Sequence, residues 1–210
     1  LPICAGLALQ QLAVVALGQD EQAARYNRQL LEGEPGASPA MQADALERQA
    51  QWQQRQGDLG AARQSLERAL ALREGLSPPD SEGLLRSLAG LADVLGRMGL
   101  HDAAEPLHRR AVALLEQSDP QGAALAGHLN ELGLWHWQRK EYPAAQALLE
   151  RAQAIIGARA PQGLELARIT ANLAQLHEAR GDTAQAQALY RQALAIYEAH
   201  GDLPEALLGR

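Results

Sequence analysis

Small residues recur at a fixed spacing along the chain, and this repeat constrains the fold more than any other feature. A glycine, or a lysine in its place, recurs at steps of 42, 41 and 41 residues, and an alanine follows it five residues later. A second alanine stands seven residues further on, and another small residue stands twelve residues before the first alanine. Such a period is typical of stacked helical repeats rather than of one compact core. The four sets are Gly57, Gly99, Lys140 and Gly181; Ala62, Ala104, Ala145 and Ala186; Ala69, Ala111, Ala152 and Ala193; and Ala50, Ala92, Gly133 and Ala174.

Prolines recur with nearly the same period and mark where the first helix of each repeat begins. Proline suits the first turn of a helix because the N–H that it lacks has no partner there, whereas glycine suits the residue after a helix end. The prolines are Pro39, Pro79, Pro120, Pro161 and Pro204. We therefore predict helical hairpins with first helices over residues 3–17, 40–56, 81–98, 122–139 and 163–180, and second helices over 20–32, 59–74, 102–117, 143–157 and 183–199.

The composition favours an all-α fold. Hydrophobic residues make up 47% of the chain, but aromatic residues only 3%, and phenylalanine is absent. A core of alanine and leucine suits closely packed helices, and hairpins that cannot bury an apolar stripe alone must stack. We predict one solenoid over residues 1–210. It has a degenerate first hairpin at 1–37, repeats at 38–78, 79–119, 120–160 and 161–200, and the start of a further or capping helix at 201–210.

The apolar segment of residues 1–17 has two interpretations, a packed helix or the remnant of a signal peptide. Gln10 and Gln11 interrupt it, so the chain has no uninterrupted run of about 18 apolar residues that would predict a membrane span. We favour the packed helix. The chain begins with Leu1 rather than methionine, so we expect a fragment or a processed product.

Three segments resemble tetratricopeptide repeats of the longer kind found in kinesin light chains: AEPLHRRAV at residues 104–112, LNELG at 129–133 and NLA at 172–174. The resemblance covers residues 40–200 and implies a right-handed superhelical solenoid whose first helices line a concave face. This sequence departs from the family pattern at Lys140, which replaces a turn glycine, and at the position usually held by an aromatic residue, which is Gln53, Leu95, His136 and His177 here. A HEAT or armadillo array, which has a similar period, is the alternative fold.

The faces of the first helices that point away from the second helices are predicted to meet a ligand. Their arginines predict acidic residues in the partner, because a guanidinium forks onto a carboxylate, and their asparagines can hold a peptide backbone. The alternative is that the arginines form solvated ion pairs with Asp44, Asp93, Glu131 and Glu178. The predicted peptide-binding residues are Arg48, Arg55, Arg86, Arg97, Asn130, Leu134, Trp137, Arg168, Asn172 and Gln175.

Trp135 and Trp137 are predicted to differ in exposure. Two residues on a helix lie about 200° apart, so both rings cannot face the core. Trp135 shares its register with the apolar residues Trp52, Val94 and Leu176, so these positions are predicted to be core. Trp137 shares its register with Gln54, Gly96 and Glu178 and is predicted to be an exposed anchor for a peptide. The alternative is that Trp137 packs under the following loop or against a neighbouring hairpin.

The remaining features bear on the function class. The net charge is −6 without a basic face, which argues against nucleic acid. Cys4 is the single cysteine, and the six histidines form no metal-binding motif, so we predict no enzymatic activity, no cofactor and no metal, and a packing role for His136 and His177.

The sequence predicts a cytoplasmic module that binds a protein or peptide, as the scaffold or sensor part of a larger bacterial protein. The alternative is a structural or oligomerising solenoid, a homo-oligomer included, that holds or regulates an adjacent catalytic domain.

Overall fold

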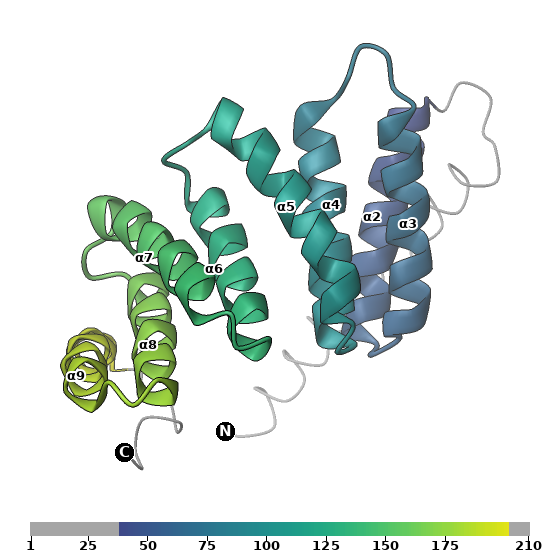
Figure 1. Cartoon of the computed structure of the whole chain (residues 1–210). Helices are drawn as coiled ribbons and strands as arrows, with labels where there is room; N and C mark the ends of the chain where they lie inside the picture. The colour runs from purple at the N-terminus through teal and green to yellow at the C-terminus, as the bar shows by residue number, and fades with distance from the viewer. Residues whose placement is uncertain (1–37, 202–210) are drawn as a thin grey trace, which may run out of the picture. The chain divides into compact units, whose positions relative to one another are not determined.

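The computed structural model describes residues 38–201, and all secondary structure in this range is helical (Figure 1). Every helix in this range begins and ends within two residues of its predicted bounds, which confirms the all-α prediction. The predicted helices over residues 3–17 and 20–32, and residues 202–210, lie outside the described residues. The helices are α2 (Pro39–Arg55), α3 (Leu59–Glu74), α4 (Ser81–Arg97), α5 (His101–Ser118), α6 (Ala123–Gln138), α7 (Tyr142–Arg159), α8 (Leu164–Ala179) and α9 (Thr183–His200).

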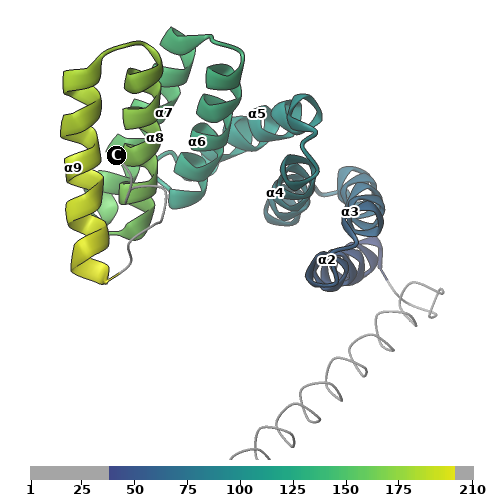
Figure 2. The ribbon, with the colours of Figure 1, turned by 90° about the horizontal axis from the view of Figure 1, so that it is seen from below.

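The described residues divide into two compact units, one ending at Gly99 and the other beginning at Leu100. In the first unit, α2 packs against α3 and α4, and α3 packs against α4. In the second unit, each helix from α5 to α9 packs against the next, and α6 also contacts α8 (Figures 1 and 2). One continuous solenoid over residues 1–210 stays a prediction. None of the described helices is long and apolar enough to span a bilayer.

The repeated small residues lie where helices approach each other. Ala62, Ala145 and Ala152 have no exposed surface, and the other repeated alanines are buried as well. Gly133 shows how close the approach is, because an added Cβ there would lie 2.7 Å from Cγ of Leu149. Leucines fill the space beside these contacts, as predicted. The cluster between α7, α8 and α9 consists of Ala145, Leu149, Leu173, Ala174, Leu176 and Leu189.

The turns between the paired helices share one backbone conformation. Gly57, Gly99 and Gly181 have φ values of 80°, 75° and 84°, in the left-handed region that favours glycine. Lys140 takes the same conformation, with φ of 61°, so the register that placed a lysine in the glycine position is confirmed.

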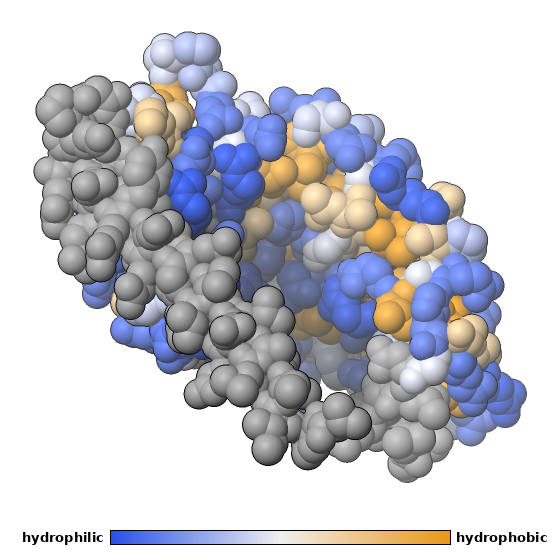
Figure 3. Space-filling view, turned by 180° about the vertical axis from the view of Figure 1, so that it is seen from behind, coloured by the Kyte–Doolittle hydropathy of each residue, from blue (hydrophilic) through white to orange (hydrophobic). Residues whose placement is uncertain are grey.

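The Kyte–Doolittle colours show a mainly hydrophilic face seen from behind, with hydrophobic residues in separate patches (Figure 3).

The prolines stand at a less regular distance from the starts of the first helices than the glycines do from their ends. Pro39 lies in the first turn of α2, where the Ser38 side chain accepts a hydrogen bond from the Met41 N–H at 3.2 Å. Pro79 lies one residue before the N-cap of α4. Pro120 and Pro161 each lie two residues before a glycine N-cap. Proline therefore marks the approach to each first helix, and enters its first turn only in α2 among those described.

Candidate peptide-binding surface

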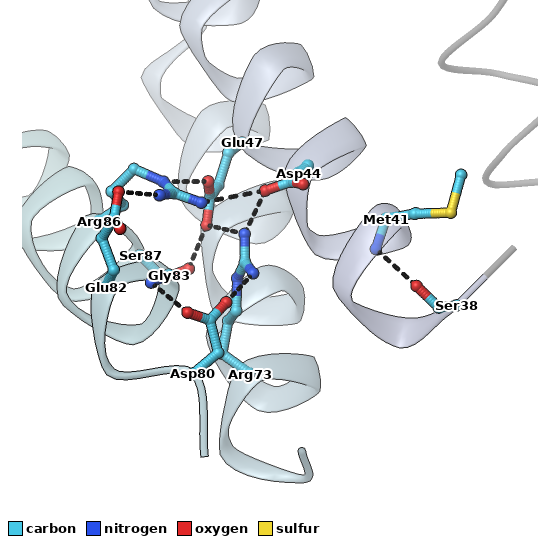
Figure 4. A network of polar contacts seen from close by, with 10 residues as sticks. All are labelled: Ser38, Met41, Asp44, Glu47, Arg73, Asp80, Glu82, Gly83, Arg86 and Ser87. Carbon is cyan, nitrogen blue, oxygen red and sulfur yellow. Dashed lines mark hydrogen bonds and ion pairs between the residues drawn. The ribbon is translucent and has the colours of Figure 1, made fainter. Parts of the chain in front are cut away.

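Arg73 of α3 lies at the centre of a polar network that joins α2, α3 and α4 (Figure 4). Its side chain is 2% exposed and forms ion pairs with Asp44, with Glu47 at 3.4 Å and with Asp80 at 2.5 Å. The Gly83 N–H also donates to the Asp80 carboxylate at 2.9 Å. This backbone bond and the charge of Arg73 hold the pKa of Asp80 below its ordinary value, against the opposing effect of burial. Charged groups therefore tie together all three described helices of the first unit.

Arg86, one of the predicted ligand contacts, is the second cation of this network. Its guanidinium lies 3.2 Å from Asp44, 3.1 Å from Glu82 and 3.5 Å from Glu47. The Ser87 hydroxyl donates to Glu47 at 2.6 Å. Arg86 therefore forms ion pairs with nearby carboxylates, which was the alternative to a ligand contact. Each of its three guanidinium nitrogens already contacts a carboxylate.

An open pocket of about 540 Å³ lies between α2 and α4 and contains two of the predicted arginines. It is lined by Gln51, Gln54, Arg55 and Arg97. Arg97 donates to the side-chain oxygen of Gln54 at 2.8 Å and lies 4.0 Å from Asp93. Arg55 is exposed and forms no ion pair with another described residue. The pocket thus presents two neutral amide side chains and two guanidinium groups, whose positive charge Asp93 only partly neutralises.

Arg48 also lies on α2 and is exposed, as predicted. The first unit therefore carries the predicted arginines in two different settings. Around Arg73 and Arg86 the charges are matched by carboxylates, whereas around Arg55 and Arg97 the cations are in excess. The charges of the first unit are therefore matched by carboxylates in one place and only partly neutralised in the other.

Asn130 and Asn172 contact each other across α6 and α8. The Asn172 side-chain amide donates to the Asn130 oxygen at 2.8 Å, and the Asn130 amide donates to Glu131 at 3.0 Å. Asn130 has no exposed surface, so the prediction that it faces a ligand is wrong. A buried amide needs hydrogen-bond partners, and α8 supplies one that sequence register alone does not show. Asn172 is only half-buried.

Three further predicted residues of the second unit keep part of their surface open. Arg168 donates to Glu165 at 3.0 and 2.7 Å and lies 3.7 Å from Glu131, and its side chain is 42% exposed. Leu134 and Gln175 are half-buried. Ion pairing therefore accounts for Arg168 as it does for Arg86.

Trp137 is half-buried rather than exposed. Its ring packs against the cluster that contains Leu149, Leu173 and Leu176. The alternative that Trp137 packs against a neighbouring hairpin is therefore the one that the structure supports, because α8 belongs to the next repeat. The residues at this register in the other repeats are Gln54, Gly96 and Glu178, none of which is aromatic, so the register alone did not indicate this packing.

The prediction of core positions at the register of Trp135 is confirmed for Val94 and Leu176, which have no exposed surface. It is wrong for Trp52, which is 48% exposed. Trp135 lies between these extremes and is half-buried. Its indole N–H donates to Asp102 of α5 at 3.1 Å, and the Arg139 guanidinium lies 4.9 Å from the ring centre, a cation–π contact.

His136 and His177 are half-buried, in agreement with a packing role, and each contacts a carboxylate near the start of the next helix. Nδ1 of His136 lies 2.6 Å from Glu141, and Nδ1 of His177 lies 3.3 Å from Asp182. The bond from His136 lowers the pKa of Glu141. In the part of the chain that the structure describes, no three His, Cys, Asp or Glu side chains come together in a way that could hold a metal ion.

Sequence reasoning missed a histidine pair and the buried arginine. Nδ1 of His108 on α5 lies 2.9 Å from Nδ1 of His128 on α6, and burial lowers the pKa of both rings to about 4. Arg73 follows Leu66 and Ala69 at helical spacing, so it stands on the buried stripe of its helix. A charged residue in such a stripe is a usable signal for a buried ion-pair partner.

Solved structures similar in fold share little sequence with this chain. BtubC (BKLC) from P. vanneervenii matches with a TM-score of 0.70 and 21% identity over 91% of this chain and 74% of its own. A putative kinesin light chain from Podosopora anserina with nearly identical TPR-like repeats matches with a TM-score of 0.68 and 21% identity over 88% of this chain and 90% of its own. The apo form of RapI matches with a TM-score of 0.74 and 14% identity over 85% of this chain and 63% of its own. At such identities these likenesses show the fold alone.

No curated protein matches the sequence. The family model for the tetratricopeptide repeat does match it, over residues 41–117 and 124–199. These two ranges make up more than half of the chain and reach into all eight described helices. The resemblance inferred from the small residues and the three short segments is thereby confirmed. The chain belongs to the tetratricopeptide repeat family.

Proposed function

We propose that the chain binds a peptide or protein segment along the faces of its first helices, as the scaffold or sensor part of a larger protein. Tetratricopeptide repeats are generally non-catalytic units of protein–protein interaction. The observation that carries the proposal is the pocket between α2 and α4, where Arg55 and Arg97 stand beside two glutamine amides. Guanidinium groups suit carboxylates, and amides suit the polar groups of an extended backbone. The proposed ligand is therefore an acidic segment.

The second unit supports the same proposal with a less charged surface. Asn172, Gln175 and Arg168 lie on α8 with part of each side chain open to solvent. In this proposal Asn172 and Gln175 bind the ligand backbone. Asn130 holds Asn172 in place through the 2.8 Å hydrogen bond rather than touching the ligand itself. Trp137 likewise acts as part of the core beneath this surface.

The test uses the full chain as bait in a lysate of the source organism, followed by affinity measurements with the protein or peptide recovered. The variant Arg55→Glu with Arg97→Glu reverses both charges of the pocket and is expected to lose the partner. A matched control, Arg68→Glu with Arg109→Glu, makes the same charge change at exposed arginines of α3 and α5 and is expected to keep it. All proteins must first show equal helicity and equal melting.

Equal recovery by all three proteins would exclude this pocket as the binding site. The alternative function, a structural or oligomerising solenoid, makes a different prediction. Light scattering would then show a stable oligomer of the wild-type chain that forms without any partner and does not respond to the pocket variant.

A further inference from the structure

Two histidines face each other where α5 packs against α6 (Figure 1). Nδ1 of His108 lies 2.9 Å from Nδ1 of His128, and the ring centres are 5.2 Å apart. His128 is 9% exposed and His108 is half-buried. Burial disfavours the charged form of both rings, so one neutral ring donates its Nδ1 hydrogen to the other. Two neutral imidazole nitrogens are thus held close together inside the second unit.

A glutamate stands one helical turn from each of these histidines. The sequence reads Glu-x-x-His on α5, with Glu105 three residues before His108. It reads His-x-x-Glu on α6, with Glu131 three residues after His128. Residues three apart share one face of a helix. Each helix therefore carries a nitrogen ligand and an oxygen ligand on the same face.

The two helices run in opposite directions, which brings both glutamates to the same side of the histidine pair. Trp135 of α6 donates its indole hydrogen bond to Asp102 of α5. From the histidine pair to this contact, the chain steps six residues back along α5 and seven residues forward along α6. Glu105 and Glu131 lie between the two contacts and stand opposite each other, each about 4.5 Å along its helix from the histidine pair.

We propose that His108, His128, Glu105 and Glu131 form a binding site for a divalent transition-metal ion such as Zn²⁺. Imidazole nitrogens and carboxylate oxygens are ligands of such ions, and the two carboxylates balance the charge of the ion. With bonds of about 2.05 Å, neighbouring ligand atoms lie about 2.9 Å apart in an octahedral site and about 3.3 Å apart in a tetrahedral one. The Nδ1 atoms, at 2.9 Å, need therefore separate only slightly. The ion replaces the shared hydrogen, which passes through solvent to Nε2 of the ring that carried it, so no net proton is released.

In the described structure the two carboxylates are turned towards arginines. Glu105 pairs with Arg109, and Glu131 lies 3.7 Å from Arg168. The site therefore forms only when both carboxylates turn from these partners, in agreement with the absence of a three-residue cluster among the described side chains. Arg109 and Arg168 are 60% and 42% exposed, so their ion pairs compete weakly. The sequence prediction of no metal considered spacing along the chain, whereas this site combines ligands from two helices.

Zinc titration of the full chain, first stripped of metal with a chelator, tests the site. Calorimetry is expected to show one Zn²⁺ bound per chain. His128→Gln should weaken binding at least about tenfold, because loss of a ligand costs no less than loss of an outer-shell partner. Glu131→Gln should have the same effect, and since this side chain is 46% exposed, the change leaves the core intact. Circular dichroism must first show equal helicity in all variants.

The matched control is His136→Gln with Glu141→Gln, which removes another histidine–carboxylate contact of the same unit and should keep the wild-type affinity. No zinc binding by the wild type, or equal binding by wild type and His128→Gln, would overturn the proposal. Equal binding by Glu131→Gln would overturn the four-ligand site and leave an ion held by histidines alone. The site does not rest on the proposed function. The charge-reversal variant of the pocket between α2 and α4 should bind zinc as the wild type does.

Discussion

At the scale of single residues, Lys140 shows that the repeat sets a backbone conformation even where the sequence does not supply the residue that suits it best. Its φ of 61° lies in the left-handed region, and the equivalent turn residues in the other described repeats are glycines. A side chain in this conformation costs about 1 kcal/mol because Cβ approaches the following carbonyl oxygen. The turn is nevertheless kept, since the two helices on either side fix it.

Lys140→Gly is therefore expected to raise the free energy of unfolding by about 0.5–1 kcal/mol, the relief of strain being partly offset by the greater freedom of glycine in the unfolded chain. The reverse change, Gly181→Lys, puts a side chain at φ of 84° and should lower it by about 1 kcal/mol. Denaturant unfolding of both variants beside the wild type measures the two effects. Destabilisation by Lys140→Gly would show that the lysine side chain contributes more than its backbone strain costs.

At the scale of helices, the spacing of small residues explains why the helix bounds could be predicted within two residues. Alanine and glycine leave a periodic trace in the sequence because close approach tolerates nothing larger. Exposure could be predicted less well. Asn130 is buried by an amide of α8 and Trp137 by leucines of α8, and such contacts depend on side chains in a neighbouring repeat that differ from one repeat to the next.

Ala152→Leu tests whether the repeated alanines are close contacts between helices. Ala152 of α7 has no exposed surface, so three added carbons overpack the joint and should lower the free energy of unfolding by about 1–3 kcal/mol. Ala147→Leu on the same helix is the control, because Ala147 is exposed and the change should have an effect near zero. Equal effects in denaturant unfolding would mean that the spacing reflects helix propensity rather than packing.

A second prediction at this scale concerns Arg73 and the charges that join three helices. Arg73→Met keeps most of the side-chain volume but leaves Glu47, which is 12% exposed, without its buried counter-ion. We expect a loss of about 3 kcal/mol in the free energy of unfolding, the lower end of the cost of removing one partner of a buried ion pair, because Asp44 and Asp80 are partly exposed. Arg86→Met is the control. That side chain is 47% exposed, so its loss should cost at most about 1 kcal/mol. Similar costs in the two variants would contradict a central role for Arg73.

At the scale of the whole molecule, the two units carry different groups that respond to acid. In the second unit, desolvation lowers the pKa of His108 and His128 from 6.5 to about 4, although Glu131 acts in the opposite direction on His128. In the first unit, the Gly83 N–H and the charge of Arg73 lower the pKa of Asp80 below 3.8. The histidines stabilise the fold while neutral, and Asp80 stabilises it while ionised.

The sign of both effects follows from proton linkage. The unfolded chain protonates its histidines near pH 6.5, so their contribution is complete above that pH and declines as the pH falls towards about 4. The contribution of Asp80 is complete above pH 3.8 and is lost only as the pH falls through its lower folded value. Acid should therefore weaken the second unit before the first.

Thermal melts followed by tryptophan fluorescence can detect this order, because Trp135 and Trp137 report on the second unit. Their transition should move to lower temperature between pH 6.5 and 4, when protonation of the buried pair is coupled to unfolding. The variant His108→Gln with His128→Gln removes the titrating rings, so its melting temperature should change little across this range, whatever its value at neutral pH. A variant as sensitive to acid as the wild type would show that other groups govern the response, and the His108–His128 contact would then have no part in the acid stability of the second unit.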